Sequence, residues 1–552
     1  DWMNVAGRIR VDNTNSLYTE KLYATSNPTL LENSKKGKYT ETRGEERQTY
    51  GDVMLNLSKT FKEKFSLDAH IGASIKDNRF DELSVYGPIA GAPNIFNVVN
   101  LDKSQKKTPK TGWHEQTQSF FYSLELGWKS QLFVTTTGRN DWASQLANSP
   151  QKSFFYPSVG VSWLPSSTFN FPEKFNYLKI RASWASVANP FPRELTIATH
   201  PYDDTISGWD DKSNYPIGQL YPERTKTWEL GFDARFLNGF TLTASWYRAD
   251  TYNQTFNPNL SASSGYSDIY IQTGHVRNTG VEASLGYDHQ WKNWNWNSQF
   301  TFSWNKNKII ELCKEWYNPI TEETITMNRL QISKLGRAKF ILKEGGSMGD
   351  LYSTTDLRRD DKGNIEIDEG GNVVVEDNLP DMKLGSVFPD YNLAWRNSVS
   401  WKNLNLGFLV TARIGGIVNS LTQANMDLFG VSEATAAARD AGGALVNGRS
   451  LVNPETWYTA IASQGGIPQY YTYSATNVRL QELSLGYTIP RKWLHNICSI
   501  TVSFVGRNLW MMYCKAPFDP EAVASTNNFY QGMDYFMMPS TRNLGFNINI
   551  KF

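Results

Sequence analysis

The hydrophobic and polar positions alternate most regularly at the end of the sequence, over residues 542–552. Leu544, Phe546, Ile548 and Ile550 alternate with glycine and asparagine, and the segment ends on Phe552. A period of two predicts a β-strand with one apolar and one polar face. About ten such residues, when tilted, cross the hydrocarbon of a bilayer. An edge strand of a soluble sheet would show the same alternation, so this segment alone leaves both interpretations open.

The same alternation recurs through the whole chain and predicts an antiparallel all-β fold. Strands are expected over residues 1–13, 48–60, 65–76, 115–128, 131–140, 156–164, 177–189, 224–236, 240–250, 275–290, 294–308, 393–401, 404–413, 476–489, 497–508 and 542–552. Two weaker strands are expected within residues 337–355, around Glu344 and Gly345. This gives about 18 strands, all within a single barrel unit over residues 1–552.

Long and short connections alternate between these strands. The short ones lie at residues 61–65, 129–130, 237–239 and 291–293, and the longest connection covers residues 414–474, with a short helix expected over 432–440. A soluble β-sandwich would have turns of similar length at both ends. The asymmetry is typical of a transmembrane β-barrel with short periplasmic turns and long outer loops.

Side-chain parity predicts which residues face lipid and which face the barrel interior. The outward set is Phe232, Leu242, Leu285, Phe302, Phe408 and Ile548, and the inward set is Glu229, Thr243, Glu282, Thr301, Thr411 and Asn547. Six tryptophans lie near the short turns, at positions Trp128, Trp163, Trp291, Trp294, Trp401 and Trp493. This clustering favours an aromatic girdle at a membrane interface over a packed soluble core.

Composition narrows the class of protein further. Mean hydropathy is −0.48, and no apolar run approaches the roughly 18 residues that a transmembrane helix needs. The net charge of +1 offers no electrostatic field to recruit nucleic acid. Three widely spaced cysteines, Cys313, Cys498 and Cys514, fit neither a disulfide framework nor a zinc site.

No catalytic or cofactor motif appears, so we expect no enzyme, no catalytic residue, no metal and no cofactor. The sequence lacks a nucleophile elbow, a phosphate loop and a His-Glu-x-x-His pair. The turns at residues 360–364 and 368–372 could be calcium loops, but their carboxylates lack the required spacing, which favours β-hairpins. An outer-membrane barrel enzyme of the protease or phospholipase type is the alternative class. It would need a base and a carboxylate brought together at the outer rim.

Aromatic residues in the long connections are the candidate substrate-binding residues, because ring faces stack on sugars and on peptide side chains. They are Trp209, Tyr215, Tyr221, Tyr266, Tyr270, Trp457, Tyr458, Tyr470, Tyr471 and Tyr473. The alternative is that these rings pack loop against loop.

Seven segments resemble recurring stretches of the SusC/RagA family, the TonB-dependent outer-membrane importers of Bacteroidetes. They are residues 155–163 (FYPSVGVSW), 177–184 (YLKIRASW), 278–282 (NTGVE), 304–308 (WNKNK), 345–350 (GGSMGD), 477–487 (NVRLQELSLGY) and 506–509 (GRNL). Their order covers nearly the whole chain. The resemblance is to the C-terminal, barrel portion of such a protein.

The resemblance implies a barrel of about 22 strands with an N-terminal plug inside. We therefore expect the plug and the first strands to be supplied outside this chain, with residues 1–13 and 542–552 several strands apart. The resemblance also implies outer-membrane localisation, a SusD-like lipoprotein as a lid, TonB acting through the plug, and import of oligosaccharides or oligopeptides. Mixed luminal charge suits either substrate: Arg8, Arg10, Asp68, His70, Lys179, Arg181, Glu229, Asp233 and Arg235.

Overall fold

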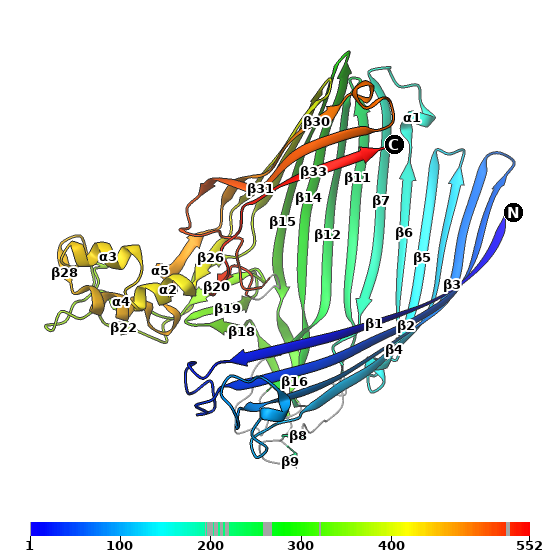
Figure 1. Ribbon diagram of the computed structural model, residues 1–552. Coiled ribbons are helices and arrows are strands. Elements are labelled where there is room, and N and C mark those ends of the chain that lie inside the picture. Colours follow the sequence, from blue (N-terminus) through cyan, green and yellow to red (C-terminus); the bar gives the residue numbers. More distant parts are fainter. Residues whose placement is uncertain are drawn as a thin grey trace. The chain divides into compact units, whose positions relative to one another are not determined.

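The structure is a computed structural model that describes residues 2–193, 195, 202–203, 208–209, 214–215, 220–257, 268–318, 322–525 and 530–552 (Figure 1). The chain divides into two compact units, each described here by itself. Unit 1 comprises Asp1–Ser162, Ser183–Lys226 and Asn253–Gln272. Unit 2 comprises Trp163–Ala182, Thr227–Tyr252 and Thr273–Phe552.

Long strands dominate the chain and follow one another in sequence order within a 16-stranded sheet. This confirms the predicted antiparallel all-β fold. The strands are β1 (Met3–Leu22), β2 (Lys38–Phe61), β3 (Phe65–Pro88), β4 (Lys110–Trp128), β5 (Leu132–Ala143), β6 (Phe154–Trp163), β7 (Phe175–Asn189), β11 (Glu223–Phe236), β12 (Phe240–Phe256), β14 (Ile271–Trp291), β15 (Trp294–Glu311), β24 (Tyr391–Trp401), β25 (Leu404–Ile414), β30 (Asn477–Ile489), β31 (Ser499–Cys514) and β33 (Asn543–Lys551).

About 18 strands were predicted for the sheet, which has 16, because the two weak strands near Glu344 do not belong to it. Both strands exist, as β19 (Ala338–Lys343) and β20 (Asp350–Ser353). They belong to a separate four-stranded sheet with β18 (Arg329–Leu335) and β23 (Met382–Ser386). Their side chains are buried without alternation, because both faces of this small sheet are covered.

The first strands of unit 1 are longer than predicted. The antiparallel ladder of β1 and β2 runs from Met3 opposite Leu57 to Leu22 opposite Lys38, through a stretch expected to be a loop. Polar pairs such as Asn13 with Arg47 continue it. A ladder outside the bilayer needs no apolar face, so hydrophobic alternation marks only the part of each strand that meets lipid.

Two of the tight turns, each a connection of three residues, begin with two consecutive residues of positive φ. Lys129 and Ser130 between β4 and β5 have φ of 52° and 54°, and Leu237 and Asn238 between β11 and β12 have φ of 49° and 50°. Two consecutive positive φ values define a type I′ turn, whose twist matches that of the flanking strands. The predicted short connections are therefore confirmed here without a glycine at either central position.

Exposed apolar side chains lie along one face of the unit 2 strands. Leu230, Phe232 and Leu285 are exposed, as is Ile548. At the tight turns, Trp294 and Trp401 stack with ring centroids 5.6 Å apart and both remain exposed. The exposure of Phe232 and Leu285 agrees with their predicted outward position, and the stacked tryptophans mark the turn end of the apolar face. Leu242, Phe302 and Phe408 of the predicted outward set are only partly exposed. The exposure of Ile548 does not distinguish one face from the other, because every residue of β33 is exposed.

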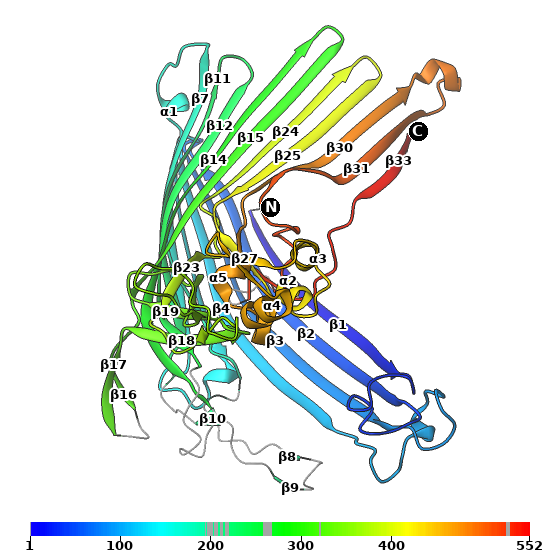
Figure 2. The ribbon, with the colours of Figure 1, turned by 90° about the vertical axis from the view of Figure 1, so that its left-hand side faces the viewer.

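The long connection after β25 folds into a small helical region, which lies in Figure 2 at the end of the unit 2 strands away from the tight turns. It contains β26 (Ile417–Ser420), α2 (Leu421–Leu428), α3 (Glu433–Asp440), α4 (Pro454–Ala462), α5 (Pro468–Tyr471) and β29 (Thr472–Ser474). The expected helix at 432–440 is α3, and the hydroxyl of Ser432 caps it by accepting the Thr435 N–H at 3.1 Å.

Shorter elements complete the described structure: α1 (Pro165–Thr168), β8 (Tyr202–Asp203), β9 (Gly208–Trp209), β10 (Asn214–Tyr215), β13 (Asp268–Ile269), β16 (Cys313–Asn318), β17 (Glu323–Met327), β21 (Asp356–Leu357), β22 (Val375–Glu376), β27 (Ala444–Val446), β28 (Ser450–Val452) and β32 (Met533–Asp534). Within the described residues, every helix is too short or too polar to span a bilayer.

Candidate functional site

The polar faces of the unit 2 strands enclose a cavity of about 660 Å³. It is lined by Phe302, which was predicted to face outward, and by four residues of the predicted inward set: Thr243, Glu282, Thr301 and Thr411. The ladder explains why they meet. Glu282 lies opposite Ser303, Ser303 opposite Asn392, and Asn392 opposite Arg413, so one row of polar side chains crosses four strands. We call this face the luminal wall.

Charges of both signs border the cavity: the cations Arg181 and Arg413 and the carboxylates Glu282 and Glu521. Arg181 on β7 lies between two carboxylates of β11, with a guanidinium nitrogen 3.0 Å from Asp233 and another 3.6 Å from Glu229. Gly231 lies between those carboxylates in sequence, and a Cβ there would come within 2.7 Å of the guanidinium carbon. The glycine therefore leaves the space that Arg181 occupies.

Segment 278–282, which is one of those that carry the family resemblance, forms the part of the luminal wall next to Glu282. A Cβ on Gly280 would lie 2.4 Å from the Tyr247 hydroxyl oxygen, so the glycine admits that ring. The Tyr247 hydroxyl donates to Asn305 at 3.2 Å. The Asn305 and Asn307 amides donate to the Asn278 carbonyl oxygen at 3.3 and 3.0 Å. The motif thus packs one ring and three amides onto the luminal side of β14 and β15.

Asn307 also anchors the turn at residues 345–350, another segment of the resemblance. Its side-chain oxygen accepts the Met348 N–H at 2.8 Å and the Ser347 hydroxyl at 3.2 Å. The buried carboxylate of Asp350 accepts the Ser347 N–H at 3.0 Å and the Lys383 ammonium at 2.6 Å. Two motifs that are far apart in sequence therefore fix the four-stranded loop sheet to β15.

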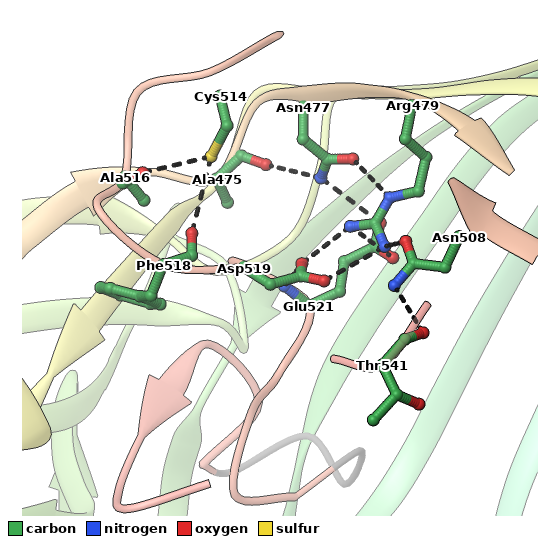
Figure 3. Close-up of polar contacts among 10 residues, drawn as sticks. All are labelled: Ala475, Asn477, Arg479, Asn508, Cys514, Ala516, Phe518, Asp519, Glu521 and Thr541. Carbon is green, nitrogen blue, oxygen red and sulfur yellow. Dashed lines mark hydrogen bonds and ion pairs between the residues drawn. The ribbon is translucent and has the colours of Figure 1, made fainter. Parts of the chain in front are cut away.

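Arg479 on β30 is the centre of the largest buried ion-pair network of the site (Figure 3). Only 4% of its surface is exposed. Its two terminal nitrogens donate to the two carboxylate oxygens of Asp519 at 2.7 and 3.2 Å, a bidentate pair. Burial raises the pKa of Asp519, but the hydrogen bonds from Arg479 and from backbone N–H groups outweigh burial and leave that pKa lowered.

The same network positions Glu521 at the edge of the cavity. Its carboxylate lies 3.3 Å from an Arg479 nitrogen and accepts the Asn477 amide at 3.3 Å, as Figure 3 shows. The Asn508 side chain accepts from Arg479 at 3.2 Å and donates to the Thr541 carbonyl at 3.2 Å. Residues 477–487 and 506–509 of the resemblance therefore hold the connection after β31 against the luminal wall.

Four of the predicted binding aromatics form the interior of the helical region. Tyr471 is 1% exposed, and its hydroxyl donates to Asp427 at 3.0 Å. Trp457, Tyr458 and Tyr470 pack against the same hydrophobic cluster, with Trp457 and Tyr470 edge to face at 5.9 Å. Burial, aided by the charge of Asp427, raises the pKa of the Tyr471 hydroxyl.

The remaining predicted aromatics are dispersed. Tyr473 packs beside Val418 and Ala475, and burial together with the Asp427 charge raises its pKa to about 12. In unit 1, Tyr221 is exposed and Tyr270 is partly buried against a hydrophobic cluster. Trp209 and Tyr215 lie in β9 and β10 with side chains that are not described, and Tyr266 lies outside the described residues.

One predicted aromatic borders a second cavity. Tyr458 lines a space of about 430 Å³ in the helical region together with Asp427, Arg439 and Glu455. This cavity combines one ring with both signs of charge. Tyr458 is thus a predicted aromatic of the long connection that borders open space.

The two acidic turns form hairpins, as predicted. Asp360 accepts the Asn364 N–H at 2.8 Å, and Asp368 accepts the Asn372 N–H at 2.8 Å. Bridges between Arg359 and Ile365 and between Ile367 and Val373 close the two turns. Within the described part of the chain, no group of three or more His, Cys, Asp or Glu side chains is arranged to hold a metal ion.

Sequence reasoning did not single out three residues that matter most in this site: Arg413, Arg479 and Glu521. Arg479 lies in a segment that carried the resemblance, so its position in a motif was a usable signal. Glu521 lies in a polar connection after β31, where no local pattern distinguishes it from other charges. Its role depends on the Arg479 contact, which joins residues 42 positions apart.

A sheet of long antiparallel strands, with one exposed apolar face edged by stacked tryptophans and one polar face lining a cavity, defines a β-barrel of the outer membrane. The chain belongs to the family described as "TonB dependent receptor-like, beta-barrel", whose sequence profile matches residues 2–509. This confirms the family resemblance and the predicted outer-membrane localisation.

Curated relatives agree with this assignment. The chain is 26% identical to TonB-dependent receptor P3 of Formosa agariphila, over 94% of this chain and 55% of the relative. It is 22% identical to TonB-dependent receptor SusC of Bacteroides thetaiotaomicron, over 68% of this chain and 38% of that protein. The chain thus spans about half or less of the length of these relatives. Both are named as receptors rather than as enzymes.

Solved structures show the same fold. The structure of the RagAB peptide importer in its "open-open" state matches 100% of this chain and 59% of its own, with a TM-score of 0.78 and 18% identity. The "closed-closed" state of the same importer matches with a TM-score of 0.76 and 18% identity. At this identity the likeness establishes the barrel fold.

Proposed function

We propose that this chain forms the barrel wall of an outer-membrane nutrient importer that takes up oligosaccharides or oligopeptides with energy supplied through TonB. The observation that carries the proposal is the row of polar side chains across β14, β15, β24 and β25, which lines a cavity on the face opposite the lipid. The chain's membership of a TonB-dependent receptor family supports TonB as the source of energy. A SusD-like lipoprotein is proposed as the lid, since one relative is SusC and one structural neighbour is RagAB.

The chemistry of the luminal wall favours a peptide among the two substrate classes. Arg181, Arg413, Glu282 and Glu521 offer both signs of charge, and hydroxyl and amide groups fill the intervening positions. These groups complement peptide amides and charged termini. Among the described residues that line the cavity, the only ring is that of Phe302, so the wall offers sugars few stacking faces beside its charged and polar groups.

Two of the predicted aromatics are proposed to make the first substrate contacts. Tyr458 lines the smaller cavity of the helical region, and Tyr221 in unit 1 is 44% exposed. The other eight stay as predictions of lower rank, because four pack within the described loops or helical region, three have no described side chain and one, Tyr471, is buried.

The plug and the first barrel strands are proposed to be supplied by a further segment of the same protein. Among the described residues, β1 pairs only with β2 and β33 pairs only with β31, so each has an open edge. An unpaired strand edge in lipid would leave backbone groups unsatisfied at several kcal/mol each. Ladder hydrogen bonds between β1 and β33 in the full-length protein would contradict this part of the proposal.

Growth on a defined nutrient tests the function. A strain carrying the full-length transporter should take up mixed oligopeptides, and deletion of either TonB or the lid lipoprotein should abolish that uptake. Competition between oligopeptides and oligosaccharides should show the peptide as the stronger competitor. A surface enzyme of the protease or phospholipase type would instead act on its substrate without TonB, and that result would overturn the importer.

Charge substitutions at the cavity sharpen the test. The double variant Arg413→Gln with Glu521→Gln should lower uptake of charged peptides more than that of neutral ones. A matched control, Asp361→Asn, removes an exposed charge from a loop turn and should leave uptake unchanged. If the double variant and the control take up charged peptides equally well, the charges of the luminal wall do not contribute to substrate recognition.

A further inference from the structure

Five cationic or titratable side chains gather on β12, β14 and β15. They are Arg248, His275, Arg277, Lys306 and Lys308, called here the basic cluster. All five belong to unit 2. Asp250, itself only 7% exposed, is their shared carboxylate: it accepts from Arg248 at 2.9 Å and Arg277 at 2.7 Å and lies 2.5 Å from the His275 ring.

The basic cluster lies on the outward face of these strands. Asn305 and Asn307 point to the lumen, where they contact Tyr247 and Asn278. Side chains alternate along a strand, so Lys306 and Lys308 point the opposite way. Arg277 neighbours Asn278 and faces outward for the same reason, and the ladder places it directly opposite Lys308.

Positive charge exceeds negative charge in the cluster. Among the described residues, the carboxylates that the ladder and the hydrogen bonds place beside the two arginines and two lysines are Asp250 and, at the far end, Glu311, which lies opposite His275. Both oxygens of Asp250 are already shared among three donors. Lys306 and Lys308 are exposed and have no ion pair within the described residues. Like charges directly opposite each other destabilise a sheet. Arg277 and Lys308 are such a pair, and a bound anion would offset their repulsion.

Depth along the barrel identifies the surroundings of the cluster. Trp246 and Trp304 precede Arg248 and Lys306 by two positions, hence on the same face and one step nearer the apolar band. β14 runs from Trp291 at the tight turn past the exposed Leu285 to Arg277. About 9–11 tilted residues suffice to cross the hydrocarbon, so Arg277 lies beyond it, at the level of the headgroups.

We propose that the basic cluster binds the phosphate of an anionic lipid headgroup in the leaflet at the loop end of the barrel. Aromatic side chains at the interface and basic side chains one step beyond match the apolar-to-anionic profile of such a lipid. Arginine offers a fork that fits phosphate oxygens, and the two lysines add mobile point charges. The continuity of the cluster with the lipid-facing surface favours a lipid over a protein partner.

The test compares diphosphorylated lipid A, the same lipid with both phosphates removed, and inorganic phosphate, each bound to the full-length transporter in neutral detergent. Native mass spectrometry measures retained lipid. We expect the diphosphorylated form to be retained at least about tenfold better than the dephosphorylated form. The double variant Lys306→Gln with Lys308→Gln should lose about tenfold or more of that affinity. The variant Lys292→Gln with Lys492→Gln, which changes exposed lysines near the tight turns, should bind as the unchanged protein does.

Three results would overturn the proposal. They are equal retention of both lipid forms, unchanged affinity in the Lys306 and Lys308 variant, or displacement of the lipid by millimolar inorganic phosphate, which would indicate a site for small anions. Correct folding of each variant is checked by its resistance to denaturation in gel electrophoresis before heating. If the double variant does not fold, the single variant Lys306→Gln should show about a fivefold loss, and no loss there would contradict the proposal equally.

Discussion

The luminal wall and the helical region of residues 417–474 place the side chains that were predicted to face the interior or a substrate in opposite ways. In the wall, Thr243, Glu282 and Thr411 border the open space of the cavity, and the Thr243 hydroxyl also donates to Asp233 at 2.9 Å. In the helical region, Tyr471 and its neighbours turn inward and build a hydrophobic interior. In a strand, the position of a residue in the alternation determines the face on which its side chain lies. In a loop, the packing of the loop itself determines whether a side chain is buried or exposed.

The largest effect is expected where the helical region depends on a buried ring. Tyr471→Ala should destabilise this region by about 3–5 kcal/mol, because it opens a cavity and removes the donor to Asp427. Peptide-resolved hydrogen exchange over residues 417–474 measures the loss. Phe429→Ala, at a ring that is 74% exposed, is the matched control and should change little. Equal effects would mean that the helical region has no specific interior.

Next in size is a charge placed on the lipid face of the wall. Leu285→Arg should cost about 2–4 kcal/mol, because its outward side chain would enter the hydrocarbon. Ser284→Arg, on the luminal face of the same strand, should cost much less. Reversible unfolding in urea from lipid vesicles measures both. A reversed order would mean that the faces of β14 are exchanged, and would remove the luminal wall.

A smaller effect is expected in the four-stranded sheet of β18, β19, β20 and β23, which should lose stability in acid. The hydrogen bond from Arg329, with one from Lys343, lowers the pKa of Asp381 to about 2, against burial, which raises it. A depressed carboxyl pKa gives stability that is present above the ordinary value near 4 and lost as pH falls toward 2. We expect faster hydrogen exchange in residues 329–343 over that interval.

The matched variants define that acid response. Asp381→Asn should lose about 1–2 kcal/mol of local stability at pH 6 and should no longer respond between pH 4 and 2. Asp361→Asn, in an exposed turn, should keep the response of the unchanged protein. An acid response that persists in the Asp381 variant would assign it to another carboxylate.

Sequence reasoning predicted the strands well for a physical reason: a membrane imposes alternation on every strand that crosses it. The same reason explains its errors. β1 and β2 continue into water, where hydrophobic alternation is not required. β19 and β20 show no alternation of buried and exposed side chains, because both faces of their sheet are buried. The aromatic rings of the long connection carried no local sign of burial, since the contact between Tyr471 and Asp427 joins residues 44 positions apart.

The most direct test of the central claim, that the polar face of unit 2 lines a passage, is the accessibility of single cysteines along β15 in intact outer membranes. In a background with Cys498→Ser and Cys514→Ser, Thr301→Cys and Ser303→Cys should react with a water-soluble maleimide. Phe300→Cys should react only with a lipid-soluble one. Equal labelling of all three by the water-soluble reagent, or labelling of the phenylalanine position alone, would contradict the account.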